Sequence, residues 1–129
     1  MKYMLLIHGN SEGWKDLEDW SQEDLRAMVG FMHGINADLS ASGELLDAQG
    51  LAGAEYAKTV RASQDGDPII TDGPFSETKE VLAGFWLLDV ASEQRALEIA
   101  ARISATPGQG GTLINQPVEV HPIGTPPAV

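Results

Sequence analysis

Two short runs of this chain are apolar at every position, and they constrain the fold more than any other feature. They are residues 3–7 (YMLLI) and residues 85–88 (FWLL). Their length is typical of strands and far too short for a membrane-spanning helix, which needs about 20 residues. Because successive side chains of a strand point to opposite faces, both faces of these strands are apolar. A sheet that contains them needs cover on both sides.

The sequence also predicts two helices. Ser21 begins the first one, with acidic residues in the first turn, and Gly43 ends it. The second helix begins at Ser92 and is closed by Pro107 and Gly108. Apolar residues recur at helical spacing in the first helix and form one stripe: Leu25, Met28, Val29, Met32, Ile35 and Leu39.

Strands and a hairpin complete the predicted order. Strands are expected over residues 2–8, 44–51, 82–90 and 118–123. Extended runs at 57–63 and 69–71 flank a dense turn, which indicates a β-hairpin. The order β-α-β, inserted hairpin, β-α-β predicts an α+β fold of the ferredoxin-like, split βαβ type. We expect residues 1–123 to form a single domain and residues 124–129 to form a flexible C-terminal tail.

A second copy of the chain is the expected cover for the outer face of the sheet. In this architecture both helices lie on one face, which leaves the other face to water. Large apolar patches are rare on monomers, and most soluble oligomers are symmetric homo-oligomers. The sequence therefore predicts a homodimer that pairs sheet to sheet.

Composition disfavours several classes of function. The 129 residues include 8 Lys and Arg against 19 Asp and Glu, a net charge of −11. Such a surface repels phosphate backbones and anionic lipid, so we expect no nucleic-acid and no membrane partner. The chain has no cysteine, which removes disulfides, thiolate catalysis and Cys-ligated metal centres. Since the sequence shows no signal-peptide core, a cytoplasmic location is expected.

A longer motif follows the predicted hairpin. Residues 71–80 are TDGPFSETKE, and residues 82–86 are LAGFW. This stretch is similar to the signature of DGPF-type proteins in the YCII-related family. Further similarity lies at residues 1–7, 43–46, 59–61 and 118–120. The resemblance implies a ferredoxin-like subunit that pairs into a dimeric α/β barrel. It implies no assigned reaction for most DGPF-type members, and a His–Asp pair is suggested for some of the wider group.

Asp72 is the first candidate for chemistry. As a turn residue it caps its own backbone beside Gly73 and Pro74, and Phe75 then fills the core. As a site residue it is a carboxylate at the mouth of a barrel cleft, acting as a general base or as a ligand acceptor. Both interpretations are open.

Further residues are candidate ligand contacts: Arg61, Phe75, Lys79, Glu80 and Trp86. Arg61 and Lys79 are cations in a chain with few of them, so each is either an anion-binding partner or a solvated surface charge. Trp86 is either a pocket residue or part of the core or dimer interface.

Two histidines are candidate acid–base groups. His8 ends the first strand on the side of Met4 and Leu6, near a sheet edge that a second subunit can close. His33 lies on the flank of the apolar stripe of the first helix. An imidazole suits proton transfer near neutral pH, and the alternative for each residue is a purely structural role. No pair of histidines has the spacing of metal ligands, so no metal and no cofactor are expected.

These observations favour an enzyme-like protein that binds a small organic molecule in a pocket at the mouth of the barrel. Acid–base chemistry would run through Asp72 with His8 or His33, without a bound cofactor. The alternative is a non-catalytic ligand-binding or regulatory accessory protein, for example a small partner of a transcription factor. The sequence leaves open whether the protein is an enzyme, and it names no substrate.

Overall fold

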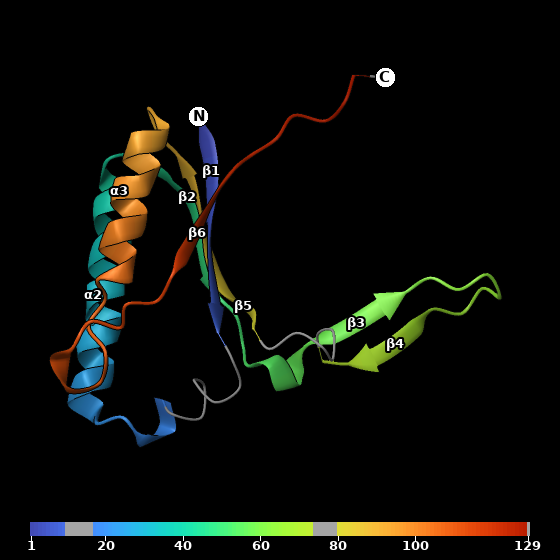
Figure 1. Ribbon diagram of the computed structural model, residues 1–129, viewed down its shortest axis with the longest axis horizontal. Coiled ribbons are helices and arrows are strands. Elements are labelled where there is room, and N and C mark those ends of the chain that lie inside the picture. The colour runs from blue at the N-terminus through green and yellow to red at the C-terminus, as the bar shows by residue number, and fades with distance from the viewer. Residues whose placement is uncertain (10–16, 74–79, 129) are drawn as a thin grey trace.

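A four-stranded antiparallel sheet with two helices on one face forms the body of the protein, and a two-stranded hairpin projects away from it (Figure 1). The computed structural model describes residues 1–9, 17–73 and 80–128. In chain order, the elements are β1 (Lys2–Gly9), the 3-10 turn η1 (Leu17–Asp19), α2 (Gln22–Ala41), β2 (Leu45–Gly50), η2 (Ala54–Tyr56), β3 (Lys58–Arg61), β4 (Ile69–Asp72), β5 (Val81–Asp89), α3 (Glu93–Ser104), η3 (Gln109–Gly111) and β6 (Val118–Pro122). Strands β3 and β4 form the hairpin.

The main sheet has the strand order β2-β5-β1-β6, and every neighbouring pair is antiparallel. Strand β5 therefore lies between β1 and β2, the two strands that α2 connects. Two helices with antiparallel sheets confirm the predicted α+β class, and the topology is compatible with a ferredoxin-like fold. The hairpin also lies where the sequence predicted it, between β2 and β5.

Serine caps begin both helices, as the sequence predicted. Ser21 Oγ accepts a hydrogen bond from the backbone N–H of Asp24 at 3.1 Å, and Ser92 Oγ accepts one from Arg95 at 3.2 Å. Each bond satisfies an N–H group that the first helical turn leaves without a partner. After α2 the chain turns at Gly43, whose φ of +78° favours glycine. In the part of the chain that the structure describes, no helix is long and apolar enough to cross a membrane.

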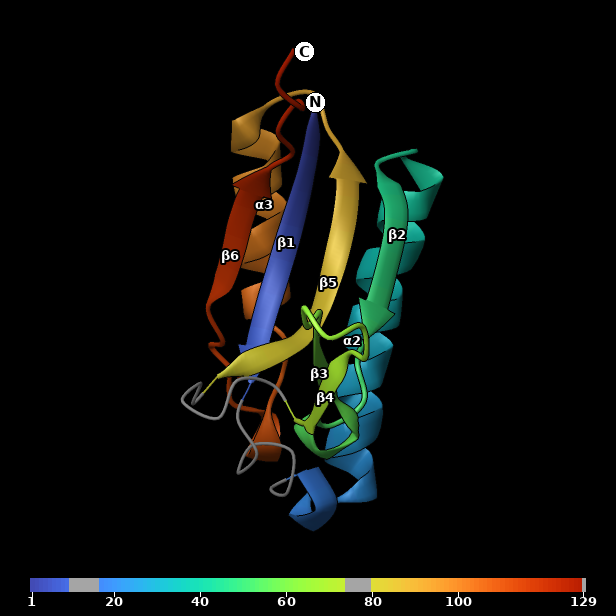
Figure 2. The same ribbon diagram turned by 90° about the vertical axis from the view of Figure 1, so that its right-hand side faces the viewer.

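The core lies between the helices and one face of the sheet. Its buried apolar side chains are Tyr3, Leu5, Ile35, Leu39, Trp86, Leu88, Val90, Ala96, Ile99, Ala100 and Ile103. On β1 and β5 these residues alternate with half-buried side chains that point to the other face: Met4, Leu6, Phe85 and Leu87. No helix of the described chain covers that face (Figure 2). Both faces of the two central strands are therefore apolar, as predicted, and one of them is open.

The apolar stripe of α2 is buried in its second half and partly exposed in its first half. Only Ile35 and Leu39, in the second half of the helix, are buried against the sheet. Nearer the start, Met28 and Met32 are half-buried, and Val29 is 43% exposed. The sequence predicted one apolar stripe, and the first half of that stripe is not packed on the sheet because it borders a cavity.

An ion pair joins α3 to the start of β2. Arg95 Nε donates to Glu44 Oε2, and Arg95 Nη2 donates to Glu44 Oε1, both at 2.9 Å. Hydrogen bonds from Arg95, and secondly from Ser42 Oγ, hold the pKa of Glu44 below its usual value. This two-pronged contact fixes the first turn of α3 against the edge strand β2.

We predict that Leu5→Ala lowers the free energy of unfolding by about 2–5 kcal/mol. Leu5 has no solvent exposure, so truncation leaves a cavity that its neighbours only partly fill. The matched control is Leu97→Ala on α3, where the side chain is 47% exposed and truncation should cost about 0.5 kcal/mol. Chemical denaturation followed by circular dichroism measures both values. Equal losses in the two variants would contradict this assignment of the core.

We also predict a pH-dependent contribution from Glu44. Because folding lowers the pKa of Glu44, its ion pair stabilises the protein above the pKa of an unfolded Glu, about 4.3. That contribution is lost as the pH falls through the lower pKa of the folded state. Glu44→Gln should therefore lower the free energy of unfolding by about 1 kcal/mol at pH 7, and this penalty should shrink as the pH falls below the pKa of an unfolded Glu and through the lower pKa of the folded state. Urea titrations over a series of pH values from 7 downward measure the penalty, and a penalty that does not change with pH would rule out the ion pair as its source.

Candidate functional site

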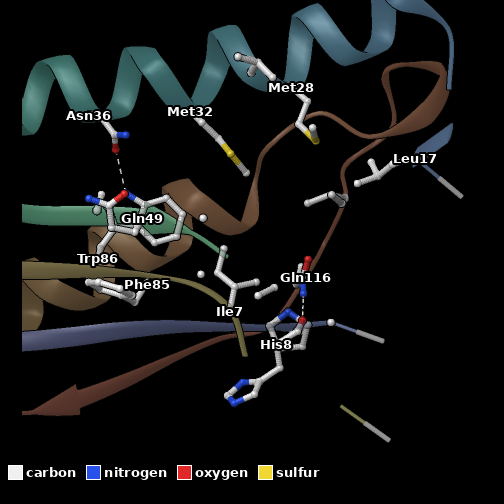
Figure 3. Close-up of a pocket in the computed structure, with 18 of the residues that line it drawn as sticks. Ile7, His8, Leu17, Met28, Met32, Asn36, Gln49, Phe85, Trp86 and Gln116 are labelled. Atoms are coloured by element: carbon white, nitrogen blue, oxygen red, sulfur yellow. Dashed lines mark hydrogen bonds between the residues drawn. The ribbon is translucent and has the colours of Figure 1, made fainter. Parts of the chain in front are cut away.

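A cavity of about 890 Å³ opens between the first half of α2, the facing end of the sheet and the segment after α3 (Figure 3). This volume lies within the roughly 300–1,000 Å³ that is typical of small-molecule sites. The sheet leaves room here because it presents small residues to α2, namely Ala48 in β2 and Gly84 in β5. Gly84 also permits the close approach of β2, since a Cβ at this position would lie 2.9 Å from the backbone carbonyl oxygen of Gln49.

One stripe of α2 forms the wall opposite the sheet. The residues of α2 that line the cavity are Met28, Val29, Met32, His33 and Asn36. Their spacing places them on one face of the helix. Because the sheet opposite carries small side chains, this part of α2 faces open space instead of a packed core.

A hydrogen bond between Trp86 and Asn36 lies at the inner end of this wall. The indole Nε1–H of Trp86 donates to Asn36 Oδ1 at 2.8 Å (Figure 3). Trp86 is 6% exposed, so its N–H needs an acceptor within the protein. Asn36 directly follows the buried Ile35 and also lines the cavity. The bond therefore lies where α2 changes from packing on the sheet to lining the cavity.

The segment after α3 closes the cavity on a third side. Gln116 Nε2 donates to the carbonyl oxygen of His8 in β1, and Ser104 Oγ donates to the carbonyl oxygen of Gln116 at 2.9 Å. Nearer α3, the N–H of Gly110 donates to Asp24 Oδ2 in the first turn of α2 at 3.0 Å. The segment is thus tied to β1, α3 and α2, the elements around the cavity.

The described lining is largely apolar and nearly uncharged. Glu80 is the one carboxylate among the described lining residues, and none of them is a lysine or an arginine. The other polar residues of the described lining carry amides or imidazoles: His8, His33, Asn36, Gln49, Gln109, Asn115 and Gln116. Within the described ranges, no group of three or more His, Asp and Glu side chains could hold a metal ion. Such a lining suits a small molecule held by apolar contacts and a few hydrogen bonds.

Some of the predicted site residues meet at this cavity. Its lining includes His8, His33, Glu80 and Trp86. The imidazole of His8 points away from the cavity, and its Nδ1 lies 3.5 Å from Glu119 Oε2 on the open face of the sheet (Figure 3). The backbone of His8 therefore lines the cavity, whereas its side chain lies on the open face of the sheet, on the side of Met4 and Leu6, as expected. His33 is exposed on the wall formed by α2.

Asp72 lies on the projecting hairpin. Its side chain is 87% exposed and forms an ion pair with Lys58 on the neighbouring strand. The next residue, Gly73, has a φ of +81°, a positive value that favours glycine and is typical of a turn. The carbonyl oxygen of Gly73 accepts a hydrogen bond from Thr59 Oγ1 at 2.7 Å. These contacts hold Asp72 at the base of the hairpin.

The remaining predicted site residues are not brought to the cavity by the described chain. Arg61 and Asp72 are absent from its lining, because the hairpin that carries them projects away from the sheet (Figure 1). A single chain therefore does not bring Asp72 together with His33 at the cavity. Phe75 and Lys79 lie outside the described residues.

Sequence reasoning missed several residues that shape the site. Met28 and Met32 were included in the apolar stripe, since residues at helical spacing commonly form a core. The position of Asn36 could have been recognised from the sequence, because its side chain is an amide directly beside that stripe. No sequence pattern indicates Gln116, since its contact with His8 joins distant parts of the chain.

Two comparisons with known proteins bear on the chain. The family model of the YCII-related domain matches residues 1–116. An uncharacterized protein of Rhizobium meliloti (strain 1021) is 32% identical over 109 residues, which cover 84% of this chain and 87% of that protein. The family match includes every described residue that lines the cavity except Pro117.

We predict that Asp72→Asn changes the free energy of unfolding by less than about 0.5 kcal/mol. The carboxylate is 87% exposed, so its ion pair with Lys58 lies in water and contributes little. Thermal or urea denaturation measures the change, and Lys58→Met is the matched variant for the other half of the pair. A large loss of stability in Asp72→Asn alone would show that the carboxylate is needed for the turn.

Proposed function

We propose, from the premise that this chain belongs to the YCII-related domain family, that it binds a small organic molecule in the cavity between α2 and the sheet. The observation that carries the proposal is the cavity, about 890 Å³ in volume and lined mainly by apolar side chains with a few amides. Such concave, largely apolar sites are typical of small-molecule binding. The net charge of −11 argues against a nucleic acid as the ligand.

The proposed chemistry is proton transfer by His33. This residue lines the cavity from α2, and an imidazole exchanges protons near neutral pH. His8 and Asp72 enter the proposed reaction only where a second copy completes the site. The ring of His8 faces the open side of the sheet, and Asp72 lies on the hairpin.

The proposed assembly is a homodimer that pairs sheet to sheet as a dimeric α/β barrel. Half-buried apolar side chains of β1 and β5 support it: Met4, Leu6, Phe85 and Leu87. No helix of the described chain covers them (Figure 2), and a second copy would remove this surface from water. The same proposal takes residues 1–123 as one domain and places the protein in the cytoplasm.

A non-catalytic ligand-binding or regulatory role is the second candidate. Among the described residues, the histidines within ion-pair distance of a carboxylate are His8 and His121, and His33 is not one of them. Catalytic imidazoles are usually oriented by a further group, and the lack of such a group at His33 among the described residues is the observation that supports this second candidate. The variant His33→Gln separates the two roles. If the protein is an enzyme that uses His33, this variant should lose turnover and keep its affinity for the ligand. If the protein only binds a ligand, the variant should keep that affinity, and the wild type should show no turnover to lose.

We predict that the neutral fluorescent probe N-phenyl-1-naphthylamine binds in the cavity and that Met32→Trp weakens its binding at least about tenfold. Met32 is half-buried on the cavity wall, so an indole there occupies space that the probe needs. The rise in probe fluorescence on binding gives both dissociation constants. Leu97→Trp is the matched control, because it makes the same kind of change at an exposed position of α3. Equal affinity in the two variants would contradict binding in this cavity.

A further inference from the structure

We infer that the cavity selects an uncharged, planar molecule that carries a carbonyl group as hydrogen-bond acceptor. The inference rests on the proposed function, since it names the class of ligand for the same cavity. It depends on an oriented amide donor, on apolar walls, and on the lack of a cation among the described lining residues.

Asn36 supplies the donor. An indole N–H can only donate, so the oxygen of Asn36 must face Trp86, as the distance of 2.8 Å between Nε1 and Oδ1 shows. The amide nitrogen is thereby turned away from Trp86, and no acceptor among the described residues contacts it. Asn36 is half-buried and lines the cavity. Its N–H groups are therefore oriented in advance for an acceptor on a ligand, which lowers the cost of binding.

The walls on either side of this donor suit a flat apolar molecule. Met28 and Met32 extend from α2, and Trp86 and Ile7 lie on the sheet side of the cavity (Figure 3). Thioether sulfur atoms are polarisable and contact aromatic rings favourably, and the sheet side adds further apolar surface. A planar ligand between these two walls would place its carbonyl group at Asn36.

Charge disfavours an anionic ligand. The described lining contains the carboxylate of Glu80 and no lysine or arginine, and the whole chain carries a net charge of −11. A carboxylate in contact with the described part of this lining would meet no cationic side chain, so moving it there from water is unfavourable, and the field of an acidic protein adds to this cost. An uncharged carbonyl compound avoids both costs and still uses the donor of Asn36.

Three probes of nearly the same shape test the inference. They are 2-naphthamide, which has an uncharged carbonyl group, 2-naphthoate, which is an anion, and naphthalene, which has no polar group. Displacement of bound N-phenyl-1-naphthylamine at neutral pH gives the dissociation constant of each. We expect 2-naphthamide to bind at least about tenfold more tightly than 2-naphthoate. Equal or tighter binding of 2-naphthoate would overturn the inference.

The variant Asn36→Asp isolates the donor. Aspartate keeps an oxygen for the N–H of Trp86 and removes the amide N–H groups. We expect the affinity for 2-naphthamide to fall at least about tenfold, and the affinity for naphthalene to stay within about threefold of its wild-type value. The control Gln94→Glu adds the same charge at an exposed position of α3 and should bind all three probes like the wild type.

The possible failures are distinguishable. If Asn36→Asp weakens naphthalene as much as 2-naphthamide, Asn36 is not the donor and the inference is wrong. If Asn36→Asp does not fold, as circular dichroism would reveal, the comparison of 2-naphthamide with 2-naphthoate on the wild type still decides the question. Failure of the proposed function gives a different result, in which N-phenyl-1-naphthylamine does not bind the wild type or binds Met32→Trp equally well.

Discussion

The hydrogen bond from Trp86 Nε1 to Asn36 Oδ1 is the contact on which the arrangement around the cavity depends. It joins a central strand to α2 at the point where the helix changes its role. On one side of this point, Ile35 and Leu39 are buried against the sheet, and on the other side Met32 lines the cavity. A buried indole N–H without an acceptor is costly, so the bond stabilises the core while it orients the amide of Asn36. The side chains of Trp86 and Asn36 therefore contribute both to the stability of the core and to the proposed site.

The cavity and the proposed dimer interface lie on opposite faces of the same sheet, and His8 belongs to both. Its carbonyl oxygen holds Gln116 on the cavity side, and its imidazole lies near Glu119 on the open side. Covering the open face with a second copy would change the surroundings of this imidazole. In the proposed assembly, His8 therefore lies beside the ligand through its backbone and beside the second chain through its imidazole.

Local signals in the sequence were sufficient for the elements but not for the site. Ser21 and Ser92 predicted both helix starts because capping involves residues only a few positions apart. Met32 lines the same cavity as Ala48 and Gly84, which are distant from it in sequence and come near it only in the fold. The position of Asp72 likewise depends on the direction in which the hairpin leaves the sheet, which no local pattern specifies. The elements were predictable, whereas the meeting of side chains at the cavity was not.

Native mass spectrometry of the wild-type protein tests the central claim most directly, namely that each chain holds one small uncharged molecule in this cavity. The protein is measured freshly purified and again after incubation with N-phenyl-1-naphthylamine. We expect a dimer that carries one small molecule per chain, either retained from the cell or supplied by the incubation. A bare mass under both conditions would contradict the claim, because a cavity of about 890 Å³ with an apolar lining would then hold no ligand of the kind it fits.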